Sequence, residues 1–280
     1  MTTAAHVGKT FGTHDSSPKI GTEIVADKAA LLSGEHAATI RELLETRGVL
    51  VFPKLGFTDE EQVAFTETLG TFAPENSGEK LYKVSLDEGV NAHADYLKGS
   101  LYWHLDGTMN EVPILASLLQ SVALGNEDEG DTEFCNTYAA YDALSDEDKA
   151  ELEALRVMHS AWNTLFYYEP EPDIRTLKQM QRIGDRELPL VWTHQSGRKS
   201  LVLGATARHI IDVDFRKSAE ILVRLRDWAT QPQFVYRHKW SVGDLVIWDN
   251  TGTMHRATPY DPNSGRLLQR TKLAGEEPFA

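Results

Sequence analysis

Two histidines and an aspartate are the residues of this chain best suited to chemistry. His104 and Asp106 stand in the run Leu101-Tyr-Trp-His-Leu-Asp-Gly-Thr108, and His255 follows far downstream. If 102–106 is a strand, alternation puts His104 and Asp106 on one face, with Tyr102 beside them. Two imidazoles and one carboxylate can hold Fe(II) on one side and leave open positions for other ligands. This set favours an oxygenase over a structural metal site.

The histidine and aspartate pair is ambiguous by itself. His104 and Asp106 could be a hydrogen-bonded pair on a strand, and only the later His255 and Arg266 make the metal-ligand interpretation dominant. We expect seven other histidines to be ordinary surface or core residues: His6, His14, His36, His159, His194, His209 and His238. For His93, a role in the site and an ordinary surface or core role are equally expected.

Composition and charge narrow the function classes. The chain has 280 residues, of which 41% are hydrophobic and 25% charged, enough to bury the core of one large β-rich domain. Its 28 basic and 42 acidic side chains give a net charge of −14. We therefore expect no nucleic-acid partner and no binding to an anionic membrane surface. An anionic substrate must meet a local basic pocket.

The single cysteine, Cys135, excludes an intrachain disulfide framework and a multi-cysteine metal site. Residues 1–13 lack the apolar core of a signal peptide, and no apolar run reaches membrane-spanning length. A cytoplasmic protein is the simple expectation.

The first elements are predicted by periodicity and capping signals. Residues 33–47 form an amphipathic pattern that ends at Gly48, and the apolar run 49–52 before Pro53 predicts a buried strand. Thr58-Asp-Glu-Glu61 is a capping box that opens a second helix.

The remaining pattern is mostly β. Short β segments are predicted over 80–106 and 114–137, and strands over 233–240 and 244–248. Helices are predicted from Ser145 through Leu155 and over 215–228. Residues 136–233 would then be an insertion, in which 167–173 mixes aromatic, proline and acidic residues as a mobile lid would.

The motifs together resemble the TauD/TfdA family of Fe(II)/2-oxoglutarate-dependent dioxygenases, over about residues 49–271. The resemblance rests on five motifs: Tyr102-Trp-His-Leu-Asp106, Gly130-Asp-Thr132, Gly243-Asp-Leu-Val-Ile-Trp-Asp-Asn250, His255-Arg-Ala257, and Arg266 with Arg270. It implies a single domain over 1–280 with the double-stranded β-helix, or jelly-roll, fold of cupin-like proteins, mainly β with outer helices.

The same resemblance assigns roles to residues of this chain. It implies that His104, Asp106 and His255 bind Fe(II), and that Arg266 and Thr132 bind the far carboxylate of 2-oxoglutarate. A guanidinium can grip a carboxylate through two parallel hydrogen bonds, and a threonine hydroxyl can add a third. The co-substrates would be 2-oxoglutarate and O₂, and succinate and CO₂ would be released.

Substrate contacts are predicted more weakly. Arg270 lies four residues beyond Arg266, so on one strand the two side chains share a face. In the family, the arginine at this position pairs with the anionic group of the substrate. We therefore expect hydroxylation of a small anionic organic substrate that carries a carboxylate, sulfonate, sulfate or phosphonate, with cleavage of an adjacent C–heteroatom bond where the oxidised carbon bears a heteroatom. Further pocket candidates are Tyr102, Tyr82, His93 and Trp248.

Two departures from the family pattern are visible. Glu129 stands where the family usually has glycine, which concerns the shape of the loop before Thr132. Ser100 stands where taurine-specific members carry an asparagine, which makes taurine itself a poor substrate candidate. A homo-oligomer is expected from the resemblance.

Two other classes of function stay open. A metal-dependent hydrolase or isomerase on a cupin-like barrel could use the same ligands to activate water. A non-catalytic binding module could keep the barrel without its chemistry. Both arginines, Arg266 and Arg270, could also serve only as ion-pair partners for the many acidic residues. Arg266 with Thr132 favours the oxygenase.

Overall fold

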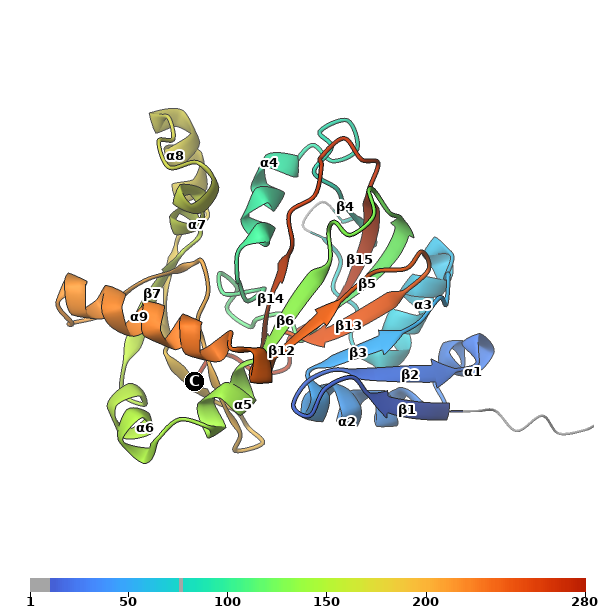
Figure 1. Cartoon of the computed structure of the whole chain (residues 1–280), viewed down its shortest axis with the longest axis horizontal. Coiled ribbons are helices and arrows are strands. Elements are labelled where there is room, and N and C mark those ends of the chain that lie inside the picture. The colour runs from blue at the N-terminus through green and yellow to red at the C-terminus, as the bar shows by residue number, and fades with distance from the viewer. Residues whose placement is uncertain (1–10, 76–77) are drawn as a thin grey trace, which may run out of the picture.

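Two facing β-sheets form the centre of the molecule in this computed structural model, which describes residues 11–75 and 78–280 (Figure 1). The larger sheet has seven strands in the order β1-β2-β3-β13-β5-β15-β4, and the smaller has the order β12-β6-β14. The larger sheet comprises β1 (Phe11–Asp15), β2 (Thr22–Ala26), β3 (Val49–Phe52), β4 (Tyr82–Val84), β5 (Ala116–Ala123), β13 (Leu245–Asp249) and β15 (Leu267–Leu273). The smaller comprises β6 (Thr132–Asn136), β12 (Val235–His238) and β14 (Thr253–Ala257).

Alternation along the central strands divides the core into two layers. On β3, Leu50 and Phe52 pack among the outer helices, whereas Val49 and Val51 face the space between the sheets. On β13, Val246 and Trp248 face the same inner space. Every residue of these two strands is buried, because helices cover one face of the sheet and the smaller sheet covers the other.

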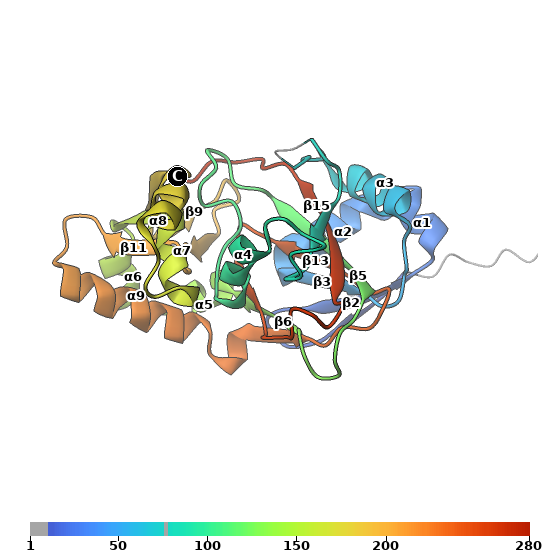
Figure 2. The same ribbon diagram turned by 90° about the horizontal axis from the view of Figure 1, so that it is seen from above.

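Helices α1 (Lys28–Leu32), α2 (Ala37–Arg47) and α3 (Asp59–Leu69) cover the outer face of the larger sheet (Figure 2). Helix α2 buries Ile40 and Leu44 and ends at Gly48, whose φ of 71° favours glycine. Thr58 and Glu61 form the predicted capping box at the start of α3. The strand 49–52 and both of these helix ends are therefore confirmed, although the helix predicted from residue 33 begins later.

The segment between β6 and β12 forms a separate lobe beside the sheets (Figure 1). It carries two small sheets, β11-β7-β8 and β10-β9, and helix α9, which covers them. Its helices are α5 (Thr137–Asp142), α6 (Asp146–Leu152), α7 (Ala161–Tyr168), α8 (Ile174–Gln181), α9 (Phe215–Ala229) and the 3-10 turn η2 (Pro232–Phe234). Its strands are β7 (Arg156–Ser160), β8 (Asp185–Pro189), β9 (Val191–Thr193), β10 (Lys199–Leu201) and β11 (Ala207–Ile210).

Two local predictions were wrong. Residues 102–106 are not a strand: only His104 pairs, through a single bridge to His255. The β prediction over 80–106 holds only for β4, because the chain then forms helix α4 (Ala94–Leu97) and the 3-10 turn η1 (Lys98–Leu101). The many glycine, asparagine and aspartate residues there mark turns between short helical pieces instead of between strands.

In the part of the chain that the structure describes, no helix has both the length and the apolar character needed to span a membrane.

Candidate metal centre and active site

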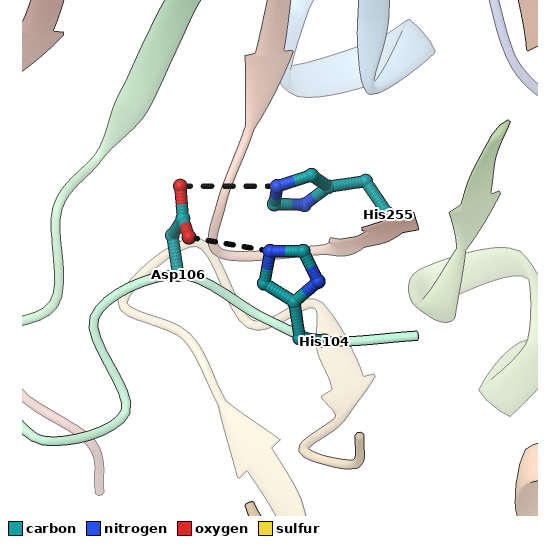
Figure 3. Close-up of side chains that lie close together, drawn as sticks. All are labelled: His104, Asp106 and His255. Carbon is teal, nitrogen blue, oxygen red and sulfur yellow. Dashed lines mark ion pairs between the residues drawn. The ribbon is translucent and has the colours of Figure 1, made fainter. Parts of the chain in front are cut away.

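His104, Asp106 and His255 come together between the two sheets (Figure 3). One potential ligand atom from each lies within 4.8 Å of the others. His104 Nε2 is 3.6 Å from one Asp106 oxygen, and His255 Nε2 is 3.8 Å from the other. These separations are too long for direct hydrogen bonds, but they suit donors that share one ion.

Backbone bonds fix the two histidines against each other. The His104 N–H donates to the His255 carbonyl at 3.0 Å, and the His255 N–H donates to the His104 carbonyl at 2.9 Å. The other lobe supports this segment, because the Ala205 N–H donates to the Trp103 carbonyl at 2.8 Å. At Gly204, with φ of 113°, a Cβ would lie 2.9 Å from His104 Cα, so only glycine permits this close approach.

Ring orientation aims the ligand atoms inward. His104 Nδ1 is 2.8 Å from the Tyr102 carbonyl, which selects the tautomer with Nδ1 protonated and leaves Nε2 free for a metal. The His255 ring packs against Trp248 at 4.6 Å between centroids, and against Phe134. The Trp248 indole N–H donates to Asn250 at 2.7 Å. Trp248 is buried behind His255, where it positions the ligand.

The protonation states suit a divalent ion. Burial lowers the pKa of His255 to about 3, so its imidazole is neutral. Burial by itself would raise the pKa of Asp106, but His255, Arg270 and His104 together with a hydrogen bond from Ser117 bring it to about 2. Metal ligands must be deprotonated, and neutral imidazole with an ionised carboxylate meets that need. No thiolate belongs to this set, because Cys135 pairs with Met254 beside His255 but by alternation faces the other side of the smaller sheet, which favours iron over a zinc site of the cysteine type.

A second basic group stands beside the triad. Arg270 on β15 places Nη1 3.6 Å from Asp106 Oδ2 and donates from Nη2 to Glu75 at 3.3 Å. Its guanidinium carbon lies 5.1 Å from the centre of the Tyr82 ring. Among the described residues, nothing accepts a hydrogen bond from the buried Arg270 Nε. This N–H is therefore available to an anionic ligand next to the metal ligands.

Arg266 is buried immediately before the start of β15. Its guanidinium donates to the Gly130 carbonyl at 2.7 Å and stacks 4.4 Å from the Tyr260 ring centre. Burial lowers the pKa of Arg266 from its ordinary value. Within the described chain its Nε, too, has no hydrogen-bond partner. A buried guanidinium with an unused N–H matches a bound carboxylate.

The loop before Thr132 is shaped around Arg266. Gly130 has φ of 71°, and a Cβ there would lie 2.5 Å from Arg266 Nε. Glu129 instead points away and accepts from Asn126 at 3.2 Å and from the Asp261 N–H at 3.1 Å. The glycine at 130 is the one that the site requires, so Glu129 does not disturb it.

Thr132 is buried at the first position of β6. The Trp240 indole N–H donates to its hydroxyl oxygen at 3.0 Å, which leaves the hydroxyl hydrogen free to donate to a ligand.

The other predicted pocket residues occupy different settings. Tyr102 packs its ring 5.1 Å from Tyr167 of α7, so it links the ligand segment to the second lobe. Tyr82 covers Arg270, as described above. His93 is exposed just before α4, with its backbone N–H bonded to Asn91. Tyr96, which sequence reasoning missed, interacts electrostatically with Asp106, Arg270 and Tyr82.

A cavity of about 620 Å³ opens elsewhere, on the outer face of the smaller sheet. Glu133, Arg237 and Arg256 line it, and alternation along their strands turns these side chains away from the triad. Arg256 pairs with Glu133 at 2.7 Å and Arg237 with Asp131 at 2.7 Å. Because its arginines already have carboxylate partners, this cavity is a weaker ligand site than the triad.

The residues thus fit a mononuclear iron centre with a buried arginine for a dicarboxylate co-substrate. The metal ligands lie between two facing sheets, and one ligand, His255, belongs to the smaller sheet. This arrangement defines the class of Fe(II)/2-oxoglutarate-dependent oxygenases. The family model described as "Taurine catabolism dioxygenase TauD, TfdA family" matches residues 12–272. The chain belongs to this family.

Individual relatives agree. The chain is 35% identical to the alpha-ketoglutarate-dependent 2,4-dichlorophenoxyacetate dioxygenase of Cupriavidus pinatubonensis, over 87% of this chain and 90% of that protein. It is 32% identical to the (S)-phenoxypropionate/alpha-ketoglutarate-dioxygenase of Sphingobium herbicidovorans, over 81% and 82%. The crystal structure of AAD-2 with Mn(II) and N-oxalylglycine is similar with a TM-score of 0.83 and 34% identity, covering 97% of this chain and all of that one.

These findings confirm the jelly-roll fold, the oxygenase class and the cofactors Fe(II), 2-oxoglutarate and O₂. The hydrolase and binding-module alternatives are not supported. Sequence reasoning missed Glu75, which pairs with Arg270, Ser117, which donates to Asp106, and Tyr96, which lies near enough to both to feel their charges. Glu75 lies in an irregular segment and Tyr96 in the short helix α4, neither with a recognisable motif. Ser117 lies on a predicted strand, but nothing in the sequence indicates its bond to Asp106.

Proposed function

We propose that this oxygenase oxidises a small organic acid that carries an aromatic group, with Arg270 as the partner of its anionic group. The observation that carries the proposal is the unpartnered, buried Nε of Arg270 beside Asp106, within the described residues. A substrate anion held there brings its neighbouring carbon close to the metal ligands. The relatives named for phenoxyacetate and phenoxypropionate derivatives support this class of substrate.

An aromatic side chain beside Arg270 supports the aromatic part of the proposal. Tyr82 stacks on Arg270, with 5.1 Å between the guanidinium carbon and the ring centre. Offset or edge contacts between such rings and a substrate ring contribute about 0.5–1.5 kcal/mol each beyond burial.

The chain's own residues orient the reactants. Bound iron supplies the activation of O₂ that couples decarboxylation of 2-oxoglutarate to oxidation of a C–H bond. His104, Asp106 and His255 would hold the iron, and Arg266 with Thr132 would fix the distal carboxylate of 2-oxoglutarate. Arg270 would then hold the substrate so that one C–H bond faces the iron, which supplies the proximity needed for selective oxidation.

We further infer that the chain works as one domain in which the insertion of residues 136–233 contributes a cover. Tyr167 at the end of α7 contacts Tyr102, and Asp173 caps α8 through the Thr176 N–H. Cleavage within 167–173 by a protease is expected to slow when iron, 2-oxoglutarate and phenoxyacetate are added. Unchanged cleavage would argue against the cover.

The function is tested by substrate-dependent succinate release. Wild type with Fe(II), ascorbate, 2-oxoglutarate and O₂ is expected to release succinate faster with phenoxyacetate than without it. Arg270→Leu should lose this stimulation but keep binding of 2-oxoglutarate. Absence of any stimulation by carboxylates, sulfonates or sulfate esters of aryl compounds would refute the proposed substrate class. Activity with Zn(II) under nitrogen would point to hydrolysis.

A further inference from the structure

Glu75 joins two cations at the edge of the active site. Its Oε1 accepts from Arg270 Nη2 at 3.3 Å, and its Oε2 accepts from Lys272 Nζ at 2.8 Å. The three side chains are 14%, 21% and 13% exposed, in that order. The Glu75 carboxylate therefore forms ion pairs with two cations that are largely removed from solvent.

Strand geometry makes this arrangement specific. Arg270 and Lys272 are two residues apart on β15, so both side chains project from the same face. The segment that carries Glu75 is held against the strand by a bond from the Ala73 N–H to the Lys272 carbonyl at 2.9 Å. On its other side Arg270 reaches Asp106 at 3.6 Å. Glu75 thus contacts Arg270, which in turn contacts the proposed metal ligand Asp106.

The local charge count has a consequence for substrate choice. Glu75, Arg270 and Lys272 together carry a net charge of +1, and Asp106 on the far side of Arg270 is counted with the metal that it would bind. A monoanion would neutralise it, whereas a dianion would leave an uncompensated negative charge close to Glu75. Repulsion between like charges is screened little in such a desolvated setting, so a second negative charge on the ligand weakens its binding.

We propose that Glu75 is a specificity-determining residue that restricts the site to singly charged anions, such as carboxylates and sulfonates, and rejects dianions such as phosphonates. The inference rests on the proposed role of Arg270 in holding the substrate anion. Glu75 itself is not a catalytic residue. It acts through Arg270 and Lys272 by setting how much positive charge they present.

A purely structural role for Glu75 leads to a different expectation. If it served only to fasten its segment to β15, removing its charge would weaken binding of every anion by a similar factor. Charge selection instead predicts a change in the ratio of affinities for a monoanion and a dianion of the same shape. That ratio is insensitive to a general loosening of the site.

The test uses two probes that share one aryl ether: phenoxyacetate and phenoxymethylphosphonate. Binding is measured by calorimetry to the anaerobic protein loaded with Fe(II) and 2-oxoglutarate, at about pH 8, where a phosphate-type group with a second pKa near 6 is dianionic. Wild type is expected to prefer phenoxyacetate. In Glu75→Gln the ratio should shift towards the phosphonate by about tenfold or more, as removal of one nearby charge dictates.

Matched variants separate the effects. Glu75→Asp keeps the charge and should keep the preference. Glu220→Gln makes the same chemical change on the exposed surface of α9 and should leave the ratio at its wild-type value. Melting temperatures show whether each variant is folded.

The outcomes distinguish this inference from the proposed function. If phenoxyacetate binds to wild type and the ratio in Glu75→Gln stays within twofold of wild type, charge selection by Glu75 is wrong although the proposed function stands. If neither probe binds to wild type and neither stimulates succinate release, the proposed substrate class fails first. A shifted ratio in Glu75→Asp equal to that in Glu75→Gln would assign the effect to shape and overturn the proposal.

Discussion

Gly130 offers a way to move Arg266 without altering any residue that would bind 2-oxoglutarate. In Gly130→Ala, the new Cβ would lie 2.5 Å from Arg266 Nε and 2.9 Å from Cδ. Ordinary van der Waals contact begins at 3.4 Å, so the guanidinium must shift by about 0.9 Å. A displacement of about 1 Å is enough to break a bidentate hydrogen-bond pair.

The size of the effect follows from that bond. A hydrogen bond to a charged group contributes about 1.5–3 kcal/mol, and about 1.4 kcal/mol corresponds to a factor of ten in affinity. Gly130→Ala is therefore expected to raise the Kd for 2-oxoglutarate by about ten- to a hundredfold. The positive φ of 71° adds a backbone cost of about 1–2 kcal/mol to folding.

Gly197 provides the matched control. It has φ of 82°, and among the described residues no heavy atom lies within 4 Å of where its Cβ would be. Gly197→Ala carries the same backbone cost without the clash, so it should lower stability by about 1–2 kcal/mol and leave the Kd for 2-oxoglutarate unchanged.

The assay is calorimetric titration of 2-oxoglutarate into the anaerobic Fe(II) protein, with denaturant unfolding to measure stability. If Gly130→Ala lost stability as Gly197→Ala does but bound 2-oxoglutarate as tightly as wild type, Arg266 could not be the anchor of the distal carboxylate. The reasoning from the Gly130 contact would then be refuted.

Three further predictions test the metal site, a buried acid and the cysteine. His255→Ala should lower the affinity for Fe(II) by about a hundredfold or more, measured by anaerobic equilibrium dialysis, because even second-sphere changes cost about ten- to a hundredfold. Asp249 is buried, and burial raises its pKa to about 6, above the 3.8 of a free carboxyl group. The folded protein holds the Asp249 proton more tightly than the unfolded chain, so the stability that this proton contributes is fully present below about pH 4 and is lost as pH rises through about 6. Asp249→Asn should therefore be more stable than wild type by up to about 3 kcal/mol at pH 7.5 but not at pH 4, as measured by denaturant unfolding. If the variant and wild type were equally stable at pH 4 and at pH 7.5, this reasoning would be contradicted. Cys135 is buried, and burial raises its thiol pKa to about 12, so a disulfide reagent should modify it only when the protein unfolds.

The sequence indicated the chemistry of the site better than its local structure. His104, Asp106 and His255 were selected by residue type and spacing, and the structure brings them together. The strand invoked to align His104 with Asp106 does not exist, because the segment pairs through a single bridge and is backed by Gly204. The bridge from His104 to His255 and the contact of Gly204 with His104 join residues about a hundred or more positions apart. Local periodicity carries no information about such contacts.

Elements with strong local signals were predicted well. The capping box at Thr58 and the helix end at Gly48 depend on neighbours within four residues, so the sequence is sufficient to place them. Glu75 and Tyr96 show the opposite case. Their positions depend on where an irregular segment and the short helix α4 lie relative to β15 and Asp106, which only tertiary structure determines.

The reciprocal backbone bonds between His104 and His255 also bear on how the enzyme gains and loses its metal. These bonds close a long loop of chain during folding, so the entropic cost of bringing the two imidazoles together is met by the β-structure and not by the ion. The metal-free protein should therefore stay folded with its ligands in place, and inactivation by loss of iron should be reversible. A site assembled in advance also accepts other divalent ions in their usual order of affinity. Which metal the enzyme carries in a cell then depends on which ion is supplied.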